Sequence, residues 1–204
     1  MNKRRKIFLT VSAVVVGALI ITLVILKVTH YEPSSGPSVA SGPAYQLPPN
    51  FSVYKSNHLD IQSMAYPTGW NIKEGSGDDY TVSFESTSTK SNVGVILIAM
   101  DEGDTLDYSN YTERLSAMAK TEPAIKSFEK SNESIKTING REWLIYDTKV
   151  TIASTGATYY NRTGLVKTGK GAGRQYFQIL LESDKAHFLE DSLTFDTMVD
   201  SFRI

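Results

Sequence analysis

Residues 134–153 read SIKTINGREWLIYDTKVTIA, and this stretch decides the fold class. At its centre, Asn139 and Gly140 form the dipeptide that most strongly indicates a two-residue β-hairpin turn. The residues that follow, 141–153, form a long run rich in β-branched and aromatic side chains. The stretch therefore predicts two antiparallel strands, over residues 134–138 and 141–153, joined by a tight turn.

Further strands are predicted on both sides of this hairpin. Towards the C-terminus, Gly-rich turn signals separate two more apolar runs, at residues 158–167 and 175–181. Towards the N-terminus, alternating or continuous apolar runs predict strands at residues 61–66, 80–85 and 93–99. The strands follow one another through short connections, which favours an antiparallel sheet.

Two regions change to the residue spacing of a helix. Asp104 or Thr105 can cap the N-terminus of a helix that runs to about residue 120, with one apolar face formed by Tyr108, Tyr111, Leu115 and Met118. After residue 184 the period changes again, and one or two closing helices are predicted from Phe188, Leu189, Leu193, Phe195, Met198, Val199 and Phe202. Together these elements predict an α+β domain in which helices cover a central antiparallel sheet.

The N-terminal residues predict a membrane anchor. Residues 1–6 read MNKRRK, and residues 7–26 contain no charged side chain. At a rise of about 1.5 Å per residue, this run would span about 30 Å as a helix, the thickness of a bilayer's hydrocarbon core. Basic residues precede the run and only Lys27 closely follows it, so we expect the N-terminus in the cytoplasm and the rest of the chain outside. The alternative is a cleaved signal peptide, whose apolar core is shorter and ends at a small-residue cleavage site.

The chain is thus expected to have four parts. These are a cytoplasmic basic stub (1–6), a transmembrane signal anchor (7–28), a Pro/Ser/Gly-rich linker (29–50) and one extracytoplasmic domain (51–204). Five of the seven prolines lie in the linker, a composition that favours extended chain. At about 3.1 Å per residue, the linker would hold the domain up to about 60 Å from the membrane.

The net charge of the whole chain is near zero, but the part expected outside the membrane is acidic. Five of the 21 Lys and Arg residues, but none of the 22 Asp and Glu residues, lie in residues 1–30. The remainder therefore carries 16 basic and 22 acidic residues, a formal charge of −6. This balance argues against a nucleic-acid partner. The chain has no cysteine, so the domain is expected to fold on its apolar core without disulfides.

Three short segments resemble the PsbP-like domain family, in the order and places where that family carries them. The Tyr-Pro-x-Gly-Trp segment at residues 66–70 resembles the opening of such domains, and residues 138–142 (INGRE) resemble the entry into their long hairpin. Residues 199–202 (VDSF) resemble their closing helix. The resemblance covers about residues 55–204 and implies an α/β/α sandwich on a central antiparallel sheet. It also implies a role in binding or assembly, because the family consists mainly of such factors rather than of enzymes.

No pattern in the sequence indicates catalysis, a cofactor or a metal site. The three histidines, His30, His58 and His187, are not spaced as zinc ligands, and no G-x-S-x-G elbow marks a serine nucleophile. The acidic residues between 101 and 107 do not follow the EF-hand spacing, and the Gly-rich residues 169–173 lack the P-loop spacing. A loop and a hairpin tip are the expected structures there.

Aromatic side chains are the better candidates for a binding site. Tyr159 and Tyr160 lie next to Arg162, with Tyr176 on the following predicted strand. Core packing explains such residues in most sheets, but tyrosine and arginine are also the residue types that dominate protein interfaces. We therefore take these four residues as a candidate interaction patch.

The sequence as a whole predicts a single-pass, membrane-anchored protein. Its PsbP-like domain is expected to act outside the cytoplasmic membrane as a non-catalytic module that binds or assembles a protein partner at the cell envelope. No cofactor is expected. The alternative is a domain that senses or carries a small ligand or a metal ion.

Overall fold

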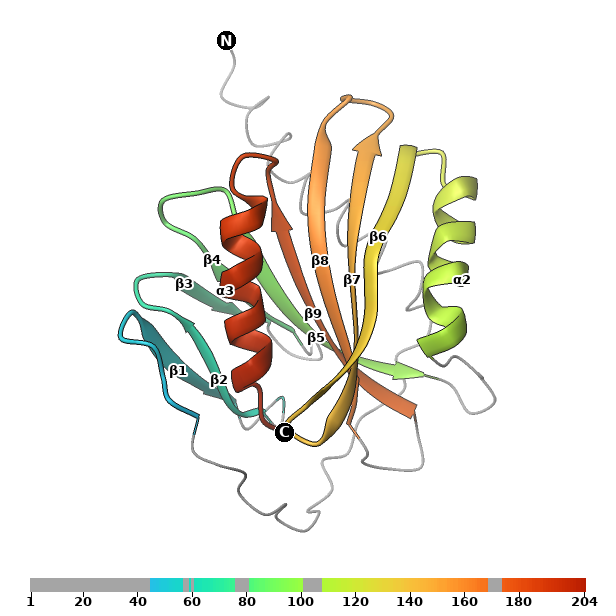
Figure 1. Cartoon of the computed structure of the whole chain (residues 1–204). Helices are drawn as coiled ribbons and strands as arrows, with labels where there is room; N and C mark the ends of the chain where they lie inside the picture. The colour runs from blue at the N-terminus through green and yellow to red at the C-terminus, as the bar shows by residue number, and fades with distance from the viewer. Residues whose placement is uncertain (1–44, 57–58, 60, 76–80, 101–107, 169–173) are drawn as a thin grey trace.

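The computed structural model describes residues 45–56, 59, 61–75, 81–100, 108–168 and 174–204. The strands are β1 (Phe51–Ser56), β2 (Ile61–Pro67), β3 (Asn71–Glu74), β4 (Thr81–Glu85), β5 (Asn92–Met100), β6 (Ile125–Ile138), β7 (Arg141–Ile152), β8 (Thr158–Lys167) and β9 (Arg174–Ser183), and the helices are α2 (Tyr108–Thr121) and α3 (Phe188–Ser201). Seven strands form one antiparallel sheet in the order β3-β4-β5-β9-β8-β7-β6, and β1 and β2 form a separate antiparallel pair. In Figure 1, α3 lies in front of the sheet beside β1 and β2, and α2 lies beside β6.

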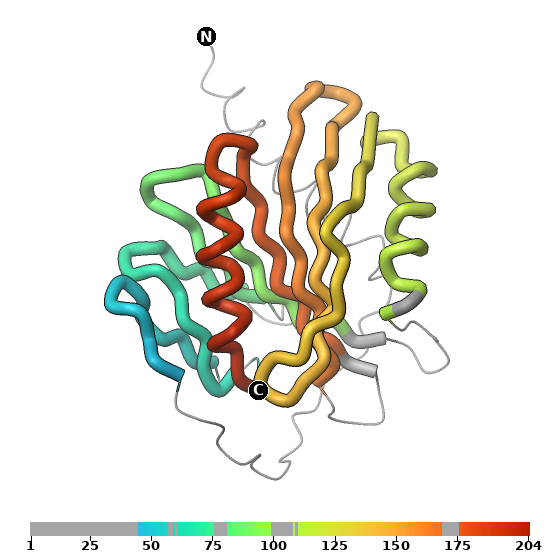
Figure 2. Tube along the Cα trace, in the orientation of Figure 1, coloured from blue at the N-terminus to red at the C-terminus, as the bar shows by residue number. Residues whose placement is uncertain are grey.

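The predicted hairpin turn between β6 and β7 is confirmed. Asn139 and Gly140 have φ angles of 54° and 74°, the two positive values that a type I′ turn requires. The Asn139 side chain also donates a hydrogen bond from Nδ2 to the Asp200 carbonyl oxygen at 2.8 Å, which ties the turn to the end of α3. Figure 2 shows this turn next to the C-terminus.

The two faces of the sheet are both covered, and β7 shows this most clearly. Its residues 143–148 are all buried, although alternate side chains of a strand point to opposite faces. Trp143 and Ile145 belong to the core under α3, and Leu144 and Tyr146 to the core under α2. We call these two sides of the sheet the α3 face and the α2 face.

The larger core lies on the α3 face. Phe195, Met198 and Val199 of α3 pack there with Met64 of β2 and with side chains of the sheet, which include Phe84, Val93, Ile179 and Leu181. Full burial of an apolar side chain of this size contributes about 1.5–3 kcal/mol. The chain end closes this layer, because Arg203 pairs with Ser63 of β2 in an isolated bridge.

The smaller core joins α2 to the opposite face. Tyr108, Tyr111 and Leu115 of α2 pack on Leu144, Tyr146, Leu165 and Tyr176. Tyr108 also fixes the helix by hydrogen bonds, because its hydroxyl donates to the Glu142 carbonyl oxygen at 2.9 Å and accepts from the Lys167 backbone N–H at 3.2 Å. A helix on each face of an antiparallel sheet makes an α+β sandwich, as predicted.

Several elements differ from the prediction in their extent. Strand β6 begins at Ile125 rather than at residue 134, and it contains a bulge between Ser131 and Ser134. The short strands β1 and β3 were not predicted, and the closing region forms the single helix α3. The predicted turn at residues 67–70 is confirmed, since Gly69 has a φ of 89° and the Trp70 N–H bonds the Pro67 carbonyl oxygen at 3.2 Å.

Other predictions fall outside the described residues. These are the transmembrane helix at 7–28, most of the linker at 29–50, the helix cap at Asp104 or Thr105, the acidic residues near it, and the Gly-rich tip at 169–173. In the part of the chain that the structure describes, no helix is both long enough and apolar enough to cross a membrane.

Candidate functional site

The four residues of the predicted interaction patch lie in different places. Tyr160 and Arg162 pair across β7 and β8 with Lys149 and Asp147 and point to the α3 face, whereas Tyr159 points to the α2 face. Tyr176 is only 3% exposed and its ring packs against Tyr108 of α2, with ring centroids 6.5 Å apart. The four side chains do not share one surface, and their role in binding stays a prediction.

Arg162 connects the sheet to α3. Its Nε lies 2.8 Å from Asp147 Oδ1, and its Nη1 lies 3.1 Å from both carboxylate oxygens of Asp196 on α3. Asp147 is buried and also accepts a hydrogen bond of 2.8 Å from Asn132 Nδ2 at the β6 bulge. Burial opposes the charge of Arg162, but the two carboxylates outweigh burial and raise its pKa above the ordinary value. Arg162 therefore holds α3 at its middle.

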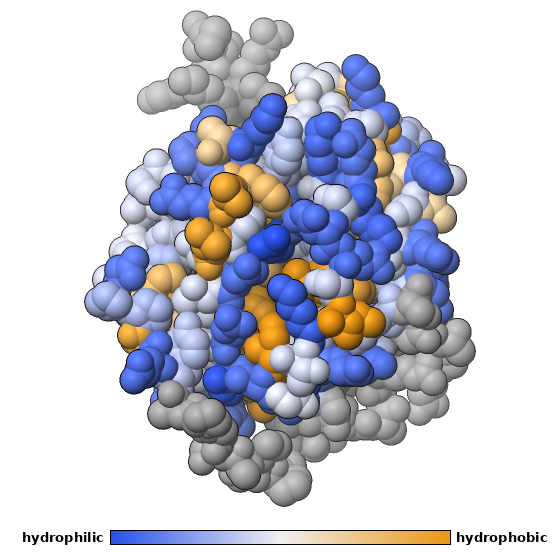
Figure 3. Space-filling model, in the orientation of Figure 1, coloured by the Kyte–Doolittle hydropathy of each residue, from blue (hydrophilic) through white to orange (hydrophobic). Residues whose placement is uncertain are grey.

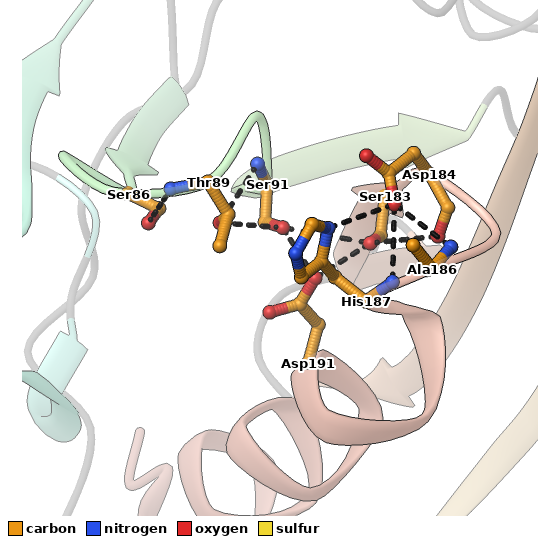
Figure 4. A network of polar contacts seen from close by, with 8 residues as sticks. All are labelled: Ser86, Thr89, Ser91, Ser183, Asp184, Ala186, His187 and Asp191. Atoms are coloured by element: carbon orange, nitrogen blue, oxygen red, sulfur yellow. Dashed lines mark hydrogen bonds and ion pairs between the residues drawn. The ribbon is translucent and has the colours of Figure 1, made fainter.

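A second polar cluster holds the N-terminal end of α3 (Figure 4). The carboxylate of Asp191 is buried and accepts hydrogen bonds from the hydroxyl groups of Ser183, at 2.5 Å, and of Ser91. Ser91 precedes β5 and Ser183 ends β9, so one side chain of α3 is bonded to two neighbouring strands. Thr89 extends the cluster by donating to Ser91 Oγ at 2.9 Å.

The same region contains serine, histidine and aspartate side chains, but their bonds are those of a helix start. Asp184 Oδ1 accepts from the backbone N–H groups of Ala186 and His187, at 2.9 and 3.0 Å, and lies 2.9 Å from His187 Nδ1. The hydrogen bond from the His187 ring, followed by the backbone bonds, lowers the pKa of Asp184. Figure 4 shows His187 directed to Asp184, while Ser183 and Ser91 are bonded to Asp191. A nucleophile bonded to a base is therefore not formed by these side chains.

The outward side of α3 carries two large apolar side chains. Leu189 is 80% exposed and Leu193 is 65% exposed. They lie one helical turn apart, so they adjoin on the helix surface. Figure 3 shows apolar residues gathered over this part of α3. Tyr45 lies one further turn along, because its hydroxyl donates to the Thr197 carbonyl oxygen at 3.4 Å. We call Leu189, Leu193, Thr197 and Tyr45 the α3 surface.

The α3 surface has a clear electrostatic character. Glu190 and Asp200 are exposed beside it, and α3 itself contains no Lys or Arg, although the Arg203 guanidinium bonds the Asp200 carbonyl oxygen at its end. Burying a leucine side chain contributes about 1.5–3 kcal/mol. A partner that covers Leu189 and Leu193 would gain this free energy for each of them. This arrangement can bind an apolar surface edged by basic groups.

Sequence reasoning missed the α3 surface because it assigned Leu189 and Leu193 to the apolar pattern of the closing helix. The buried side of α3 is formed by residues 191, 192, 195, 198, 199 and 201. At 100° per residue, positions 189 and 193 lie on the other side of the helix. A helical projection of residues 188–201 could have shown that Leu189 and Leu193 lie away from the buried side of the helix.

Metal binding by acidic or histidine clusters finds no support in the described ranges. Within them, no group of three or more His, Cys, Asp or Glu side chains is placed to hold a metal ion.

Comparisons with known proteins bear on the family. Residues 49–204 match the model of the PsbP family. No curated protein matches the chain at a significant level. Among solved structures, the cyanobacterial PsbP protein (CyanoP) of Synechocystis sp. PCC 6803 is similar, with a TM-score of 0.58 and 15% identity over 83% of this chain and 99% of CyanoP. The Ran-binding protein Mog1p of Saccharomyces cerevisiae has a TM-score of 0.53 and 10% identity over 76% of this chain and 95% of Mog1p.

At such identities, the two solved structures show a shared fold. The family model covers three quarters of the sequence, including every strand and helix of the described sandwich. The resemblance to the family is thereby confirmed, and this chain belongs to the PsbP family.

Proposed function

We propose that this protein is a membrane-anchored binding module of the cell envelope. Residues 7–28 anchor it in the cytoplasmic membrane, residues 29–50 form a stalk, and the PsbP domain lies outside. The domain is not an enzyme; it binds a protein partner through the α3 surface. The basic N-terminus and the uncharged run after it support the anchor and its orientation.

One observation carries the proposed binding role. Leu189 and Leu193 are 80% and 65% exposed on a helix that Asp191 and Arg162 fix to the sheet. Because the backbone of a fixed helix is already ordered, only its side chains lose freedom on binding, which favours affinity. The acidic residues beside the leucines favour a partner whose apolar contact is edged by Lys or Arg.

Site-specific crosslinking in cells tests the binding surface. A photoreactive amino acid replaces Leu193 in one variant and Val53, which is 48% exposed on β1, in a control variant. We expect a discrete crosslinked protein from position 193 but not from position 53. The same crosslink should disappear when Leu189 is changed to Ser, a surface change that should leave the melting temperature within about 2 °C. Equal crosslinking from both positions, or none from position 193, contradicts the proposal.

Protease accessibility tests the orientation separately. Protease added to intact cells, after permeabilisation of any outer layer, should cut the Pro-rich residues 29–50 and release the domain. A chain that is cut only after the cytoplasmic membrane is broken would reverse the proposed topology.

A further inference from the structure

A row of polar side chains crosses the centre of the sheet on the α2 face. Glu182 of β9 pairs with Asn161 of β8 on one side and with Asn92 of β5 on the other. Directly opposed residues of antiparallel strands point to the same face, with Cβ atoms about 4.5–5.5 Å apart. Asn161 in turn opposes Thr148 of β7, which is two residues from Tyr146, so the row lies on the same face of the sheet as the Tyr146 cluster. Figure 1 shows β5, β9 and β8 as the central strands.

One oxygen atom of this row is buried without a donor, and a carboxyl group lies beside it. Within the described residues, no hydrogen bond or ion pair reaches the Glu182 carboxyl group, and this residue is half-buried. Asn92 Oδ1 is buried and has no hydrogen-bond partner in the same part of the chain. Asn161 Nδ2 donates to Thr148 Oγ1 at 3.4 Å, so its Oδ1 is the atom left to accept. A buried acceptor without a donor, such as Asn92 Oδ1, is rare in proteins and calls for a partner such as an ion or a water molecule.

We propose that Glu182, Asn92 and Asn161 form a binding site for a calcium-type divalent cation. All three contribute oxygen atoms, which calcium prefers, and no sulfur or nitrogen ligand is offered. Calcium suits the site better than magnesium, because magnesium demands near-ideal octahedral geometry and gives up its water reluctantly. A bound cation offsets the negative charge of Glu182 and gives Asn92 Oδ1 a partner.

Neighbouring groups set the strength of the site. Tyr159 is two residues from Asn161 on β8 and points to the same face, so its ring lies on the side of the sheet where the cation would bind. Glu85, one strand beyond Asn92, is already paired with Lys73, with 2.6 Å between Oε2 and Nζ. A single unpaired carboxylate with neutral oxygens predicts weak binding, with a Kd of about 10⁻⁴–10⁻³ M, as in extracellular calcium modules.

Calorimetric titration of the full-length chain with calcium chloride tests the site. The protein is first stripped with a chelator, and magnesium chloride serves as the comparison cation. We expect saturable calcium binding and at least a tenfold weaker Kd for Glu182→Gln, which keeps the shape of the side chain and removes its charge. Asn92→Ala should weaken binding as well. Glu129→Gln is the matched control, because Glu129 is an exposed carboxylate on the edge strand β6, paired with Lys149.

Terbium luminescence gives a second readout. Terbium replaces calcium at oxygen sites, and a tyrosine close to the ion transfers excitation to it. Tyr159→Phe should reduce the tyrosine-excited emission while calcium still binds in the calorimeter. The proposal is overturned if Glu182→Gln binds calcium as tightly as the wild type, or if the folded wild type shows no saturable binding up to about 10 mM calcium. Either outcome leaves the role of the α3 surface untouched.

Discussion

At the scale of single residues, Gly164 of β8 tests how tightly the core on the α3 face is packed. A Cβ atom there would lie 3.3 Å from the rings of Phe195 and Trp143. Overpacking of a well-filled core costs about 1–3 kcal/mol. We expect Gly164→Ala to lower the free energy of unfolding by that amount, measured by thermal unfolding of the full-length chain.

Gly94 of β5 is the matched control for this substitution. A Cβ atom at Gly94 would meet nothing within 4 Å, and its φ angle is an ordinary one. Replacing such a glycine reduces the freedom of the unfolded chain, so Gly94→Ala should be neutral or stabilising by up to about 1 kcal/mol. Equal losses for the two alanine variants would show that the contact with Phe195 and Trp143 is not the cause.

At the scale of elements, short stretches of sequence predicted most strands of the sheet but not the contacts that fix α3 to it. The type I′ turn and the long apolar strands were predictable because Asn139, Gly140 and the runs that became β5 and β7 carry their signals in adjacent residues. Strand β3 is exposed along its whole length, and most of the first half of β6 is exposed too, so neither carries an apolar period. The anchors of α3 were beyond local reasoning, because Ser91 and Asp191 are 100 residues apart in the chain. Their pairing depends on strand order, which no short stretch encodes.

The start of α3 depends on the buried carboxylate of Asp191. Asp191→Ala would leave the buried hydroxyl group of Ser91 without its acceptor, and that of Ser183 with only the Asp184 carbonyl oxygen at 3.2 Å. An unsatisfied buried hydroxyl costs about 1–3 kcal/mol, so we expect a loss of about 2–4 kcal/mol in the free energy of unfolding. The preceding residue, Glu190, is exposed, and Glu190→Ala should change stability by no more than about 0.5 kcal/mol. Hydrogen exchange should also show faster exchange of the α3 amides in the Asp191 variant than in the Glu190 variant. Comparable behaviour of the two variants would mean that core packing alone fixes α3.

At the scale of the whole molecule, Glu182 couples stability to pH when no cation is bound. Burial raises its pKa from 4.5 to about 7 in the folded state. Between these values the folded protein holds a proton that the unfolded chain has released, so stability is highest at the acidic end and falls as pH rises through about 7. One pKa unit corresponds to about 1.4 kcal/mol, which gives a loss of about 3 kcal/mol across the window. Glu133 has a lowered pKa, caused first by its hydrogen bond from Lys130. Its contribution to the free energy of unfolding is therefore lost only at more acidic pH.

The pH effect is measured as the difference between two proteins. Thermal or denaturant unfolding of the wild type and of Glu182→Gln, both in chelator and at several values from about pH 5 to about pH 8, isolates the contribution of this one carboxyl group. The wild type should lose stability relative to Glu182→Gln as pH rises. Above about pH 8, the difference between their free energies of unfolding should no longer change with pH. Glu129→Gln should follow the wild type, because its partner Lys149 is on the surface. Calcium added at pH 8 should restore part of the lost stability in the wild type alone, since a ligand that binds only the folded state stabilises it. A constant difference between wild type and Glu182→Gln at every pH would mean that the carboxyl group is not desolvated in the folded protein.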